Sequence, residues 1–270
     1  MEIFISWHGK FLSLLFVAIA LAAPIYAQQP GERPALNDPT APPGIIFGRT
    51  VPIRVGQEYG SAFVIDYKGR QYLVTAKHLV KNLPKKDATI QLFEDLQWKD
   101  LRADILNCKS SEVDAVALRF DKPEKLSPDP AVEATSSDLV LGMTVLFFGF
   151  PNFGREVGLY TLFNKTGQHL PLVKRGVVSA SDWIDKDANL LYFDAFNNKG
   201  FSGGPIIAFD TTTQKWQIVA VVSGYLPEAS QVSLQGHLID SHDLVNSGIM
   251  VGYHIRHVLD AIDASTEAAK

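Results

Sequence analysis

The sequence has a single cysteine, Cys108, so the folded chain cannot contain an intramolecular disulfide. Such a chain must be held together by its hydrophobic core, and 270 residues with 46% hydrophobic content are enough to bury one. No histidine lies near Cys108 in the sequence. We therefore interpret Cys108 as a small apolar side chain near a strand end rather than as a nucleophile.

The sequence also lacks an excess of basic residues. Its 25 Lys and Arg are outnumbered by 29 Asp and Glu, which gives a formal net charge of -4. Nucleic-acid binding depends on a basic surface that neutralises phosphates, so we expect no nucleic-acid partner. His237 and His242 flank Asp240 and Asp243, but this spacing matches no strong ligand motif and favours a polar surface loop. We expect no metal and no cofactor.

Residues 1–27 have the layout of a secretory signal peptide. Lys10 precedes an uncharged apolar run from Phe11 to Ala23, and the small Ala27 stands before the polar Gln28. We predict cleavage after Ala27 and export, either to a bacterial periplasm or as a secreted protein, because an exported chain with one cysteine suits a bacterium better than an animal secretion. A retained signal would instead anchor the chain in a membrane. No membrane partner is otherwise expected.

Short β-prone runs separated by turn signals fill most of the remaining chain. The first expected strand is Ile45–Phe47, and a later one is Leu159–Phe163. This pattern predicts an all-β fold of two six-stranded antiparallel β-barrels with a C-terminal helix. The expected boundaries are 28–44 for a proline-rich mobile lead-in, 45–125 for the N-terminal barrel, 126–138 for the linker, 139–253 for the C-terminal barrel and 254–270 for the helix and tail.

Only the tail of the chain shows helical spacing. The apolar residues expected on one face of this helix are Ile255, Val258, Leu259 and Ile262. His254 and His257 stand at the start of the same helix, and we interpret both as solvated side chains.

Around Ser202 the sequence is Gly200-Phe201-Ser202-Gly203-Gly204-Pro205, which predicts a tight loop. A serine that attacks a carbonyl needs preplaced N–H donors for the oxyanion that forms. Glycine at position 200 allows the backbone to point such N–H groups at one place beside Ser202. The alternative is an ordinary glycine-rich turn that carries a solvated serine.

His78 and Asp114 are the candidates for a base and for the group that orients it. His78 follows a strongly β-prone run, and Asp114 opens the mostly apolar strand Asp114–Leu118. A carboxylate at the mouth of a buried strand is unfavourable unless it is paired. Pairing with a histidine would fix the imidazole tautomer and stabilise the imidazolium formed when the base takes a serine proton.

Together these segments resemble the trypsin-like (chymotrypsin-fold) serine peptidases, and most closely their cysteine-poor, HtrA-type bacterial branch. The resemblance extends over residues 45–262, and no PDZ module is expected after residue 270. The matching segments are Gly60–Ile65, Thr75–His78, Asp114–Leu118, Gly149–Pro151, Gly176–Ala180, Asp194–Asn197, Gly200–Pro205 and Gly248–Tyr253.

The resemblance implies a serine endopeptidase that hydrolyses peptide bonds through an acyl-enzyme. Ser202 would be the nucleophile, His78 the general base and then acid, and Asp114 the orienter; the N–H groups of Gly200 and Ser202 would form the oxyanion hole. The expected partner is then a polypeptide substrate. HtrA-like proteins are often trimers, so the resemblance also allows a homo-oligomer. The rival is a catalytically silent or latent member that binds peptides or a partner protein through the same cleft.

The sequence departs from the family's pattern at Phe201, where Asp or Asn is usual. Phenylalanine cannot pair with a newly freed N-terminal amine, so activation by that route is not expected, and the ring needs an apolar pocket of its own. The resemblance puts the base of the substrate pocket at Phe196, with Val222, Ser223 and Gly224 as one wall. Because Phe196 is not an acid, small or medium apolar side chains fit this pocket better than Lys or Arg.

Overall fold

The computed structural model describes residues 41–94, 97–120, 125–137, 139–151, 170–234 and 237–267, with the backbone alone for residues 232–234 and 237–242. All of these residues belong to one compact unit, Pro34–Lys270. The expected signal peptide with its cleavage point after Ala27, most of the lead-in and the strand expected at Leu159–Phe163 lie outside the described residues. No helix within the described ranges is long and apolar enough to cross a membrane.

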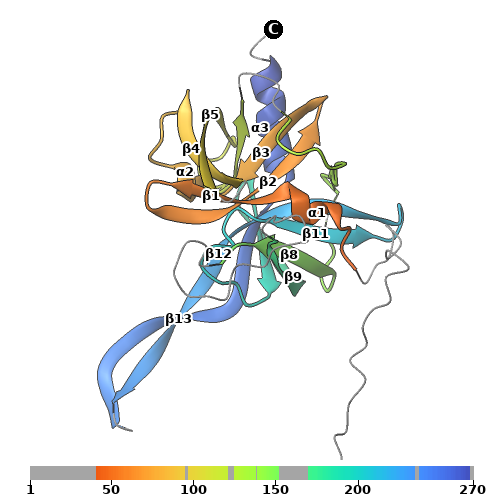
Figure 1. Cartoon of the computed structure of the whole chain (residues 1–270). Helices are drawn as coiled ribbons and strands as arrows, with labels where there is room; N and C mark the ends of the chain where they lie inside the picture. The colour runs from red at the N-terminus through yellow and green to blue at the C-terminus, as the bar shows by residue number, and fades with distance from the viewer. Residues whose placement is uncertain are drawn as a thin grey trace, which may run out of the picture. The chain divides into compact units, whose positions relative to one another are not determined.

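Six antiparallel strands of the first β block close into a barrel in the order β1-β2-β3-β6-β5-β4 (Figure 1). Their bounds are β1 Thr50–Val55, β2 Glu58–Tyr67, β3 Arg70–Thr75, β4 Ala88–Glu94, β5 Gln97–Asn107 and β6 Val116–Arg119. The middle of β2 is buried on both faces. Ala62 and Val64 point into the barrel core, while Phe63 and Ile65 belong to a second cluster that also holds residues of the other β block.

The second β block contains six antiparallel strands that pair in a ring, because β11 pairs with both β8 and β12. Their bounds are β8 Thr144–Gly149, β9 Leu172–Asp185, β10 Ala188–Asp194, β11 Pro205–Asp210, β12 Lys215–Leu234 and β13 His237–His254. A two-residue strand, β7 (Glu133–Ala134), adds to β12 in parallel. The predicted fold of two β-barrels with a C-terminal helix is confirmed.

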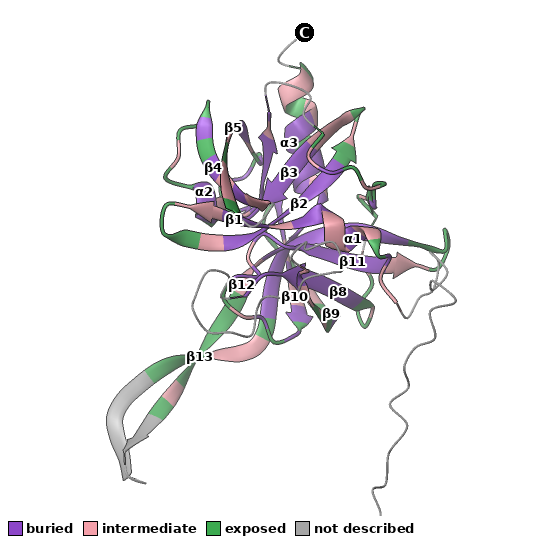
Figure 2. Ribbon diagram, viewed as in Figure 1, coloured by how far each residue is buried: buried purple, intermediate pink, exposed green. Residues whose placement is uncertain are grey.

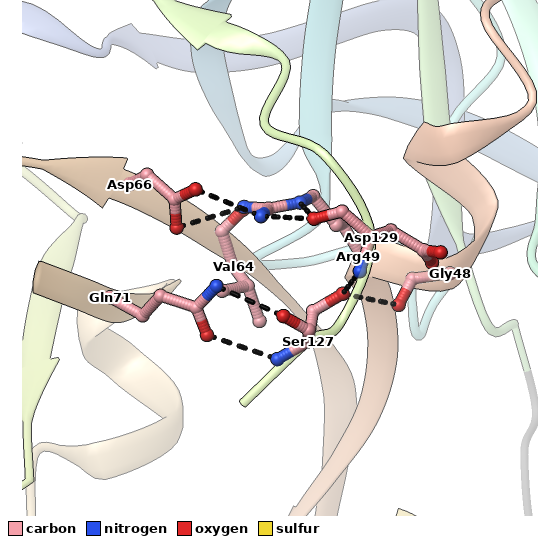
Figure 3. A network of polar contacts seen from close by, with 7 residues as sticks. All are labelled: Gly48, Arg49, Val64, Asp66, Gln71, Ser127 and Asp129. Carbon is pink, nitrogen blue, oxygen red and sulfur yellow. Dashed lines mark hydrogen bonds and ion pairs between the residues drawn. The ribbon is translucent and has the colours of Figure 1, made fainter. Parts of the chain in front are cut away.

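The segment expected as a linker is fastened to the first barrel before it supplies β7. The guanidinium of Arg49 is completely buried; it donates to Asp66 Oδ2 at 3.0 Å and to the carbonyl of Asp129 at 2.6 Å (Figure 3). Gln71 on β3 exchanges two hydrogen bonds of 3.0 Å with the backbone of Ser127. A buried charge is tolerated when it is paired and hydrogen-bonded in this way. These contacts fix residues 127–129 against β2 and β3.

The prediction of a strand at Ile45–Phe47 is wrong, because these residues lie in a short helix, α1 (Ile45–Arg49). Ile46 and Arg49 are its buried residues, and a separation of three positions places them on the same side of a helical turn. Thr50 closes this turn by donating its hydroxyl to the Ile46 carbonyl at 2.8 Å. In a strand the same two side chains would face opposite sides.

The prediction of a loop around His237 and His242 is also wrong. These residues belong to β13, which pairs with β12 from Ala220↔His254 to Leu234↔His237 and forms a long hairpin. Figure 2 shows buried residues on the strands of both barrels, whereas the described part of this hairpin beyond the sheet is mostly exposed. Backbone pairing, which does not require an apolar face, continues the two strands into this hairpin.

The C-terminal helix, α3 (Arg256–Glu267), packs against β5 and β6 of the first barrel. All four apolar residues predicted on its inner face are buried, which confirms that prediction. The prediction that His254 and His257 are solvated is wrong, because His254 is 1% and His257 6% exposed. His254 Nε2 lies 2.9 Å from the Ser137 carbonyl, and His257 Nε2 accepts a hydrogen bond of 3.1 Å from the Asn189 N–H. These backbone partners, invisible in the sequence, allow both rings to be buried.

Candidate active site

The pairing of β3 with β6 brings Asp114 to His78. Thr75, at the end of β3, pairs with Val116 at the start of β6, so the residues just beyond each of them lie side by side. His78 stands on the short helix α2 (Lys77–Val80) directly after β3. Asp114 Oδ1 accepts the His78 backbone N–H at 2.8 Å, and Asp114 Oδ2 lies 2.7 Å from His78 Nδ1. The carboxylate thus holds both the backbone and the ring of the histidine.

Ser223, on β12, joins this pair to Ser202. Its hydroxyl donates to Asp114 Oδ2 at 2.6 Å, and its carbonyl accepts the hydroxyl of Ser202 at 2.8 Å. Among the described residues no hydrogen bond joins Ser202 Oγ to His78. Hydrogen bonds of this kind are often loose in free enzymes and tighten when substrate binds. The structure therefore gathers all three residues that we predicted from the sequence, with Ser223 as the link.

Strands from both barrels hold the backbone around Ser202. The carbonyl of Ser202 accepts the N–H of Ser61, on β2, at 2.8 Å. On the other side the N–H of Gly203 donates to the Val222 carbonyl at 2.7 Å, and the N–H of Val222 donates to the Gly204 carbonyl at 2.9 Å. The loop that carries Ser202 is thereby placed between β2 of the first barrel and β12 of the second.

Residues 198–201 form a β-turn next to Ser202. The N–H of Phe201 donates to the Asn198 carbonyl at 3.1 Å, and Gly200, the third residue of the turn, has a φ of 105°. A positive φ at this position is the mark of a type II turn, which glycine adopts without strain. Type I and type II turns differ in the direction of their central peptide. The conformation of Gly200 therefore decides to which side its own N–H points.

The hydroxyl of Ser61 fixes the next peptide of this turn. It donates to the Gly200 carbonyl at 2.7 Å and accepts the N–H of Phe150 at 2.9 Å, and Ser61 is completely buried. A buried hydroxyl with both a donor and an acceptor partner is a rigid contact, because losing either partner leaves a polar group unpaired. Ser61 lies in the segment Gly60–Ile65, but nothing in its local sequence indicates this contact, because Gly200 is 139 positions away.

The four residues expected to form the substrate pocket have different surroundings. Val222 is completely buried in the core of the second barrel, so that only its backbone is available to a pocket wall. Phe196 is 55% exposed, which is typical of a surface ring rather than of the floor of an enclosed pocket. Ser223 and Gly224 are half-buried and follow Val222 along β12.

Asn197 connects this region to the loop that precedes Ser202. Its side chain is 2% exposed, its Nδ2 donates to the Gly224 carbonyl at 2.9 Å, and its own carbonyl accepts the side-chain amide of Asn246. Among the described residues, Asn197 Oδ1 is buried without a hydrogen-bond partner. Asn197 belongs to the segment Asp194–Asn197, but its contacts could not be predicted from the sequence, because its partners lie 27 and 49 positions away.

Burial controls the ionisation of two groups near the site. It raises the pKa of Tyr253 to about 12, and the carboxylate of Asp114 adds to the effect, so this phenol stays neutral beside the His78–Asp114 pair. Burial also raises the pKa of the Cys108 thiol to about 12, and this thiol donates to the Ala115 carbonyl at 3.2 Å. Within the described ranges, no three or more His, Cys, Asp or Glu side chains form a group that could hold a metal ion.

A family model described as the trypsin-like peptidase domain matches residues 60–221, which is more than half of the chain. The chain belongs to the trypsin-like peptidase family. The matched range includes His78, Asp114 and Ser202 and ends on β12. No curated protein matches the sequence. The chain thus carries a trypsin-like peptidase domain that contains all three of these residues.

Solved peptidase structures share the fold of this trypsin-like chain. The HtrA-type protease AlgW with a tripeptide is 18% identical with a TM-score of 0.53, and the match covers 83% of this chain and 62% of that one. The M. tuberculosis protease Rv3671c is 16% identical with a TM-score of 0.50 in its active form, with 81% of each chain covered. Its inactive form has the same identity and score, with 86% of this chain and 95% of that one covered. The chain therefore spans less than two thirds of the AlgW chain.

Proposed function

We propose that the protein is a serine endopeptidase in which Ser202, His78 and Asp114 form the catalytic triad. The observation that carries this proposal is the hydrogen-bonded chain in which Asp114 Oδ2 lies 2.7 Å from His78 Nδ1 and accepts the Ser223 hydroxyl at 2.6 Å. The Ser223 carbonyl in turn accepts the Ser202 hydroxyl at 2.8 Å. Membership in the trypsin-like peptidase family supports the same assignment.

In the proposed reaction Ser202 Oγ attacks the carbonyl carbon of a peptide bond while His78 Nε2 takes its proton. Asp114 orients the ring through Nδ1 and stabilises the imidazolium. The oxyanion accepts hydrogen bonds from the N–H groups of Gly200 and Ser202, and His78 then gives its proton to the leaving amine. Water, activated by the same histidine, hydrolyses the acyl-enzyme and restores the Ser202 hydroxyl.

For the residue on the amino side of the cleaved bond, we propose a preference for small or medium apolar side chains over Lys and Arg. The ammonium of Lys174 lies 5.3 Å from the centre of the Phe196 ring, so a basic substrate side chain that reached this ring would meet a like charge. No acid stands at position 196 to offset it. The HtrA-type protease AlgW was solved with a tripeptide, and we propose that this chain likewise takes a polypeptide.

Digestion of an unfolded protein, with the new peptide ends sequenced by mass spectrometry, tests the activity and the preference together. We expect cleavage by the wild type and none by Ser202→Ala, with a loss of roughly 10⁶-fold in kcat for His78→Ala. Ser111→Ala is the matched control, because Ser111 is an exposed serine outside the triad. Cleavage that survives in Ser202→Ala, or that occurs mainly after Lys and Arg, would contradict the proposal.

A latent enzyme is the second candidate, and the hydrogen bond from Ser202 Oγ to the Ser223 carbonyl favours it. In this form the nucleophile would turn towards His78 only when a peptide occupies the cleft. A short peptide added together with a serine-reactive fluorophosphonate would then speed up labelling of Ser202. In a constitutively active enzyme the same peptide would compete with the probe and slow the labelling.

We further propose that the protein acts outside the cytoplasm after removal of residues 1–27. The support is the uncharged apolar run from Phe11 to Ala23 before Ala27, together with the single cysteine. N-terminal sequencing of the protein recovered from an exported fraction should give Gln28 as the first residue. An intact Met1 in a soluble cytoplasmic fraction would contradict export.

A further inference from the structure

Lys174, on β9, reaches across to the loop that leads to Ser202. Its ammonium donates to the carbonyl of Phe196 at 2.7 Å and also to the side-chain oxygen of Asn198. Asn198 is the first residue of the turn that contains Gly200, since its carbonyl accepts the Phe201 N–H. Lys174 therefore binds the loop two residues before the turn and again at the residue where the turn begins.

Two aromatic rings also lie close to this ammonium. Lys174 Nζ lies 5.3 Å from the centre of the Phe196 ring and 5.4 Å from that of the Phe201 ring. Both distances are within the range in which a cation is attracted to the face of a ring, about 6 Å. One ammonium thus contacts residues 196, 198 and 201, which lie on both sides of Gly200.

The Phe201 ring, which the Lys174 ammonium contacts, is held in place by its own packing. It is completely buried, and its ring packs edge-on against Phe147 with the ring centres 5.2 Å apart. Gly149 gives it room: a Cβ at that position would lie 2.6 Å from Phe201 Cδ1. The ring therefore has the apolar pocket that we expected it to need, and the Lys174 ammonium lies over this ring.

We propose that Lys174 is a positioning residue, a built-in cation that holds the 198–201 turn in the conformation that presents the Gly200 N–H to the oxyanion. The inference rests on the proposed function, because it concerns the oxyanion hole of the same site. Without the ammonium, the Asn198 side chain and the Phe196 carbonyl lose their shared partner. The central peptide of the turn is then free to rotate towards the type I form, which withdraws the Gly200 N–H.

We expect the contribution of the Lys174 ammonium to folding to be small. Burial lowers the pKa of Lys174, which means that the charged form is less favourable in the folded protein than in the unfolded chain. Removing the charge relieves this burial penalty, which offsets part of the loss of the two hydrogen bonds, so we expect only a small change in the free energy of unfolding. Methionine keeps the length and flexibility of the stem but cannot donate hydrogen bonds, so Lys174→Met isolates the contribution of the ammonium.

The experiment compares the wild type with Lys174→Met, Lys174→Arg and Arg175→Met. Arg175 is the matched control, because it is the next residue of β9 and is exposed. For each protein we would measure kcat and KM on one cleaved peptide, the rate of labelling by a fluorophosphonate, and Tm. For Lys174→Met we expect a decrease of about 10- to 100-fold in kcat and in labelling rate, comparable to partial loss of an oxyanion donor, with KM and Tm little changed. Lys174→Arg should keep most of the activity, and Arg175→Met all of it.

Each result decides between distinct conclusions. If Lys174→Met is labelled as fast as the wild type, the inference is overturned while the proposed function stands. If Lys174→Arg loses as much activity as Lys174→Met, the assignment of the effect to the positive charge is overturned. A lower Tm for Lys174→Met in proportion to its lower kcat would show a structural role instead. If the folded wild type is not labelled either with or without added peptide, the proposed function fails, and the inference fails with it.

Discussion

The hydroxyl of Ser223 donates a hydrogen bond of 2.6 Å to Asp114 Oδ2, the same oxygen that lies 2.7 Å from His78 Nδ1. Ser223 belongs to the second barrel, and Asp114 lies at the edge of the first. This contact therefore ties the two halves of the proposed triad together. Because the Ser223 carbonyl also accepts the Ser202 hydroxyl at 2.8 Å, one residue links the acid to the nucleophile.

Replacing Ser223 with alanine should lower kcat while leaving the backbone contact to Ser202 in place. A hydrogen bond to a charged group contributes about 1.5–3 kcal/mol, and loss of part of it from the orienting carboxylate should reduce kcat roughly 10-fold. The measurement is steady-state peptide hydrolysis, with Ser111→Ala as the control. An unchanged kcat in Ser223→Ala would show that Asp114 orients His78 without this support.

Replacing Ser61 with alanine should lower both stability and activity. The change removes the hydrogen bonds from the Ser61 hydroxyl to the Gly200 carbonyl and from the Phe150 N–H to this hydroxyl, with an expected loss of about 1–3 kcal/mol in the free energy of unfolding. Freed from this contact, the turn at Gly200 should also hold its oxyanion donor less firmly, which lowers kcat by roughly 10-fold.

The control for Ser61→Ala is Thr50→Val, which removes a buried hydroxyl that donates to the Ile46 carbonyl, outside the proposed catalytic residues. Urea unfolding and peptide hydrolysis would be measured on both variants. A similar loss of stability with an unchanged kcat in both would contradict a specific role of Ser61 in the turn.

Cys108 should resist alkylation in the folded protein. Burial raises its pKa to about 12, so at pH 8 the thiolate fraction is on the order of 10⁻⁴, and the thiolate is the reactive form. Iodoacetamide should therefore modify the chain in urea but not in its absence, as followed by intact mass. Modification of the folded chain at the rate of a free thiol would mean that this side chain is accessible and ionised.

His257 should make the protein less stable in acid. Burial lowers its pKa in the folded state, so the unfolded chain binds a proton near pH 6.5 while the folded chain does not. The unfolded state binds more protons there, and Tm should fall as pH decreases below about 6.5. His257→Gln, which keeps an acceptor for the Asn189 N–H, should show a shallower decrease of Tm between pH 7 and 5. Equal slopes for the two proteins would exclude His257 as the cause.

The fold followed from local patterns in the sequence. Short β-prone runs and turn signals predicted the barrels, and the spacing of Val258, Leu259 and Ile262 predicted the inner face of α3. The order and local setting of His78, Asp114 and Ser202 also identified the residues that the structure gathers. These features depend on near neighbours along the chain, and sequence patterns report such neighbours well.

Contacts between distant segments were not predictable in this way. Lys174 lies 22 positions from Phe196, and it meets the Phe196 carbonyl only because β9 runs beside the loop after β10. Arg49 and Asp129 are 80 positions apart, and nothing in their local sequence indicates that an arginine would be buried. The same reason explains His254 and His257, whose backbone partners, Ser137 and Asn189, are 117 and 68 positions away along the chain. Periodicity gives the face of an element but not the partner that covers it.

The most direct test of the account is to map where a fluorophosphonate probe attaches to the folded protein. The probe forms a covalent bond with a serine only when that serine is activated as a nucleophile. We predict one adduct on the wild type, located at Ser202 by peptide mass spectrometry, and none on Ser202→Ala. An adduct that persists in Ser202→Ala, or a folded wild type that stays unmodified with and without added peptide, would contradict the assignment of Ser202 as the nucleophile.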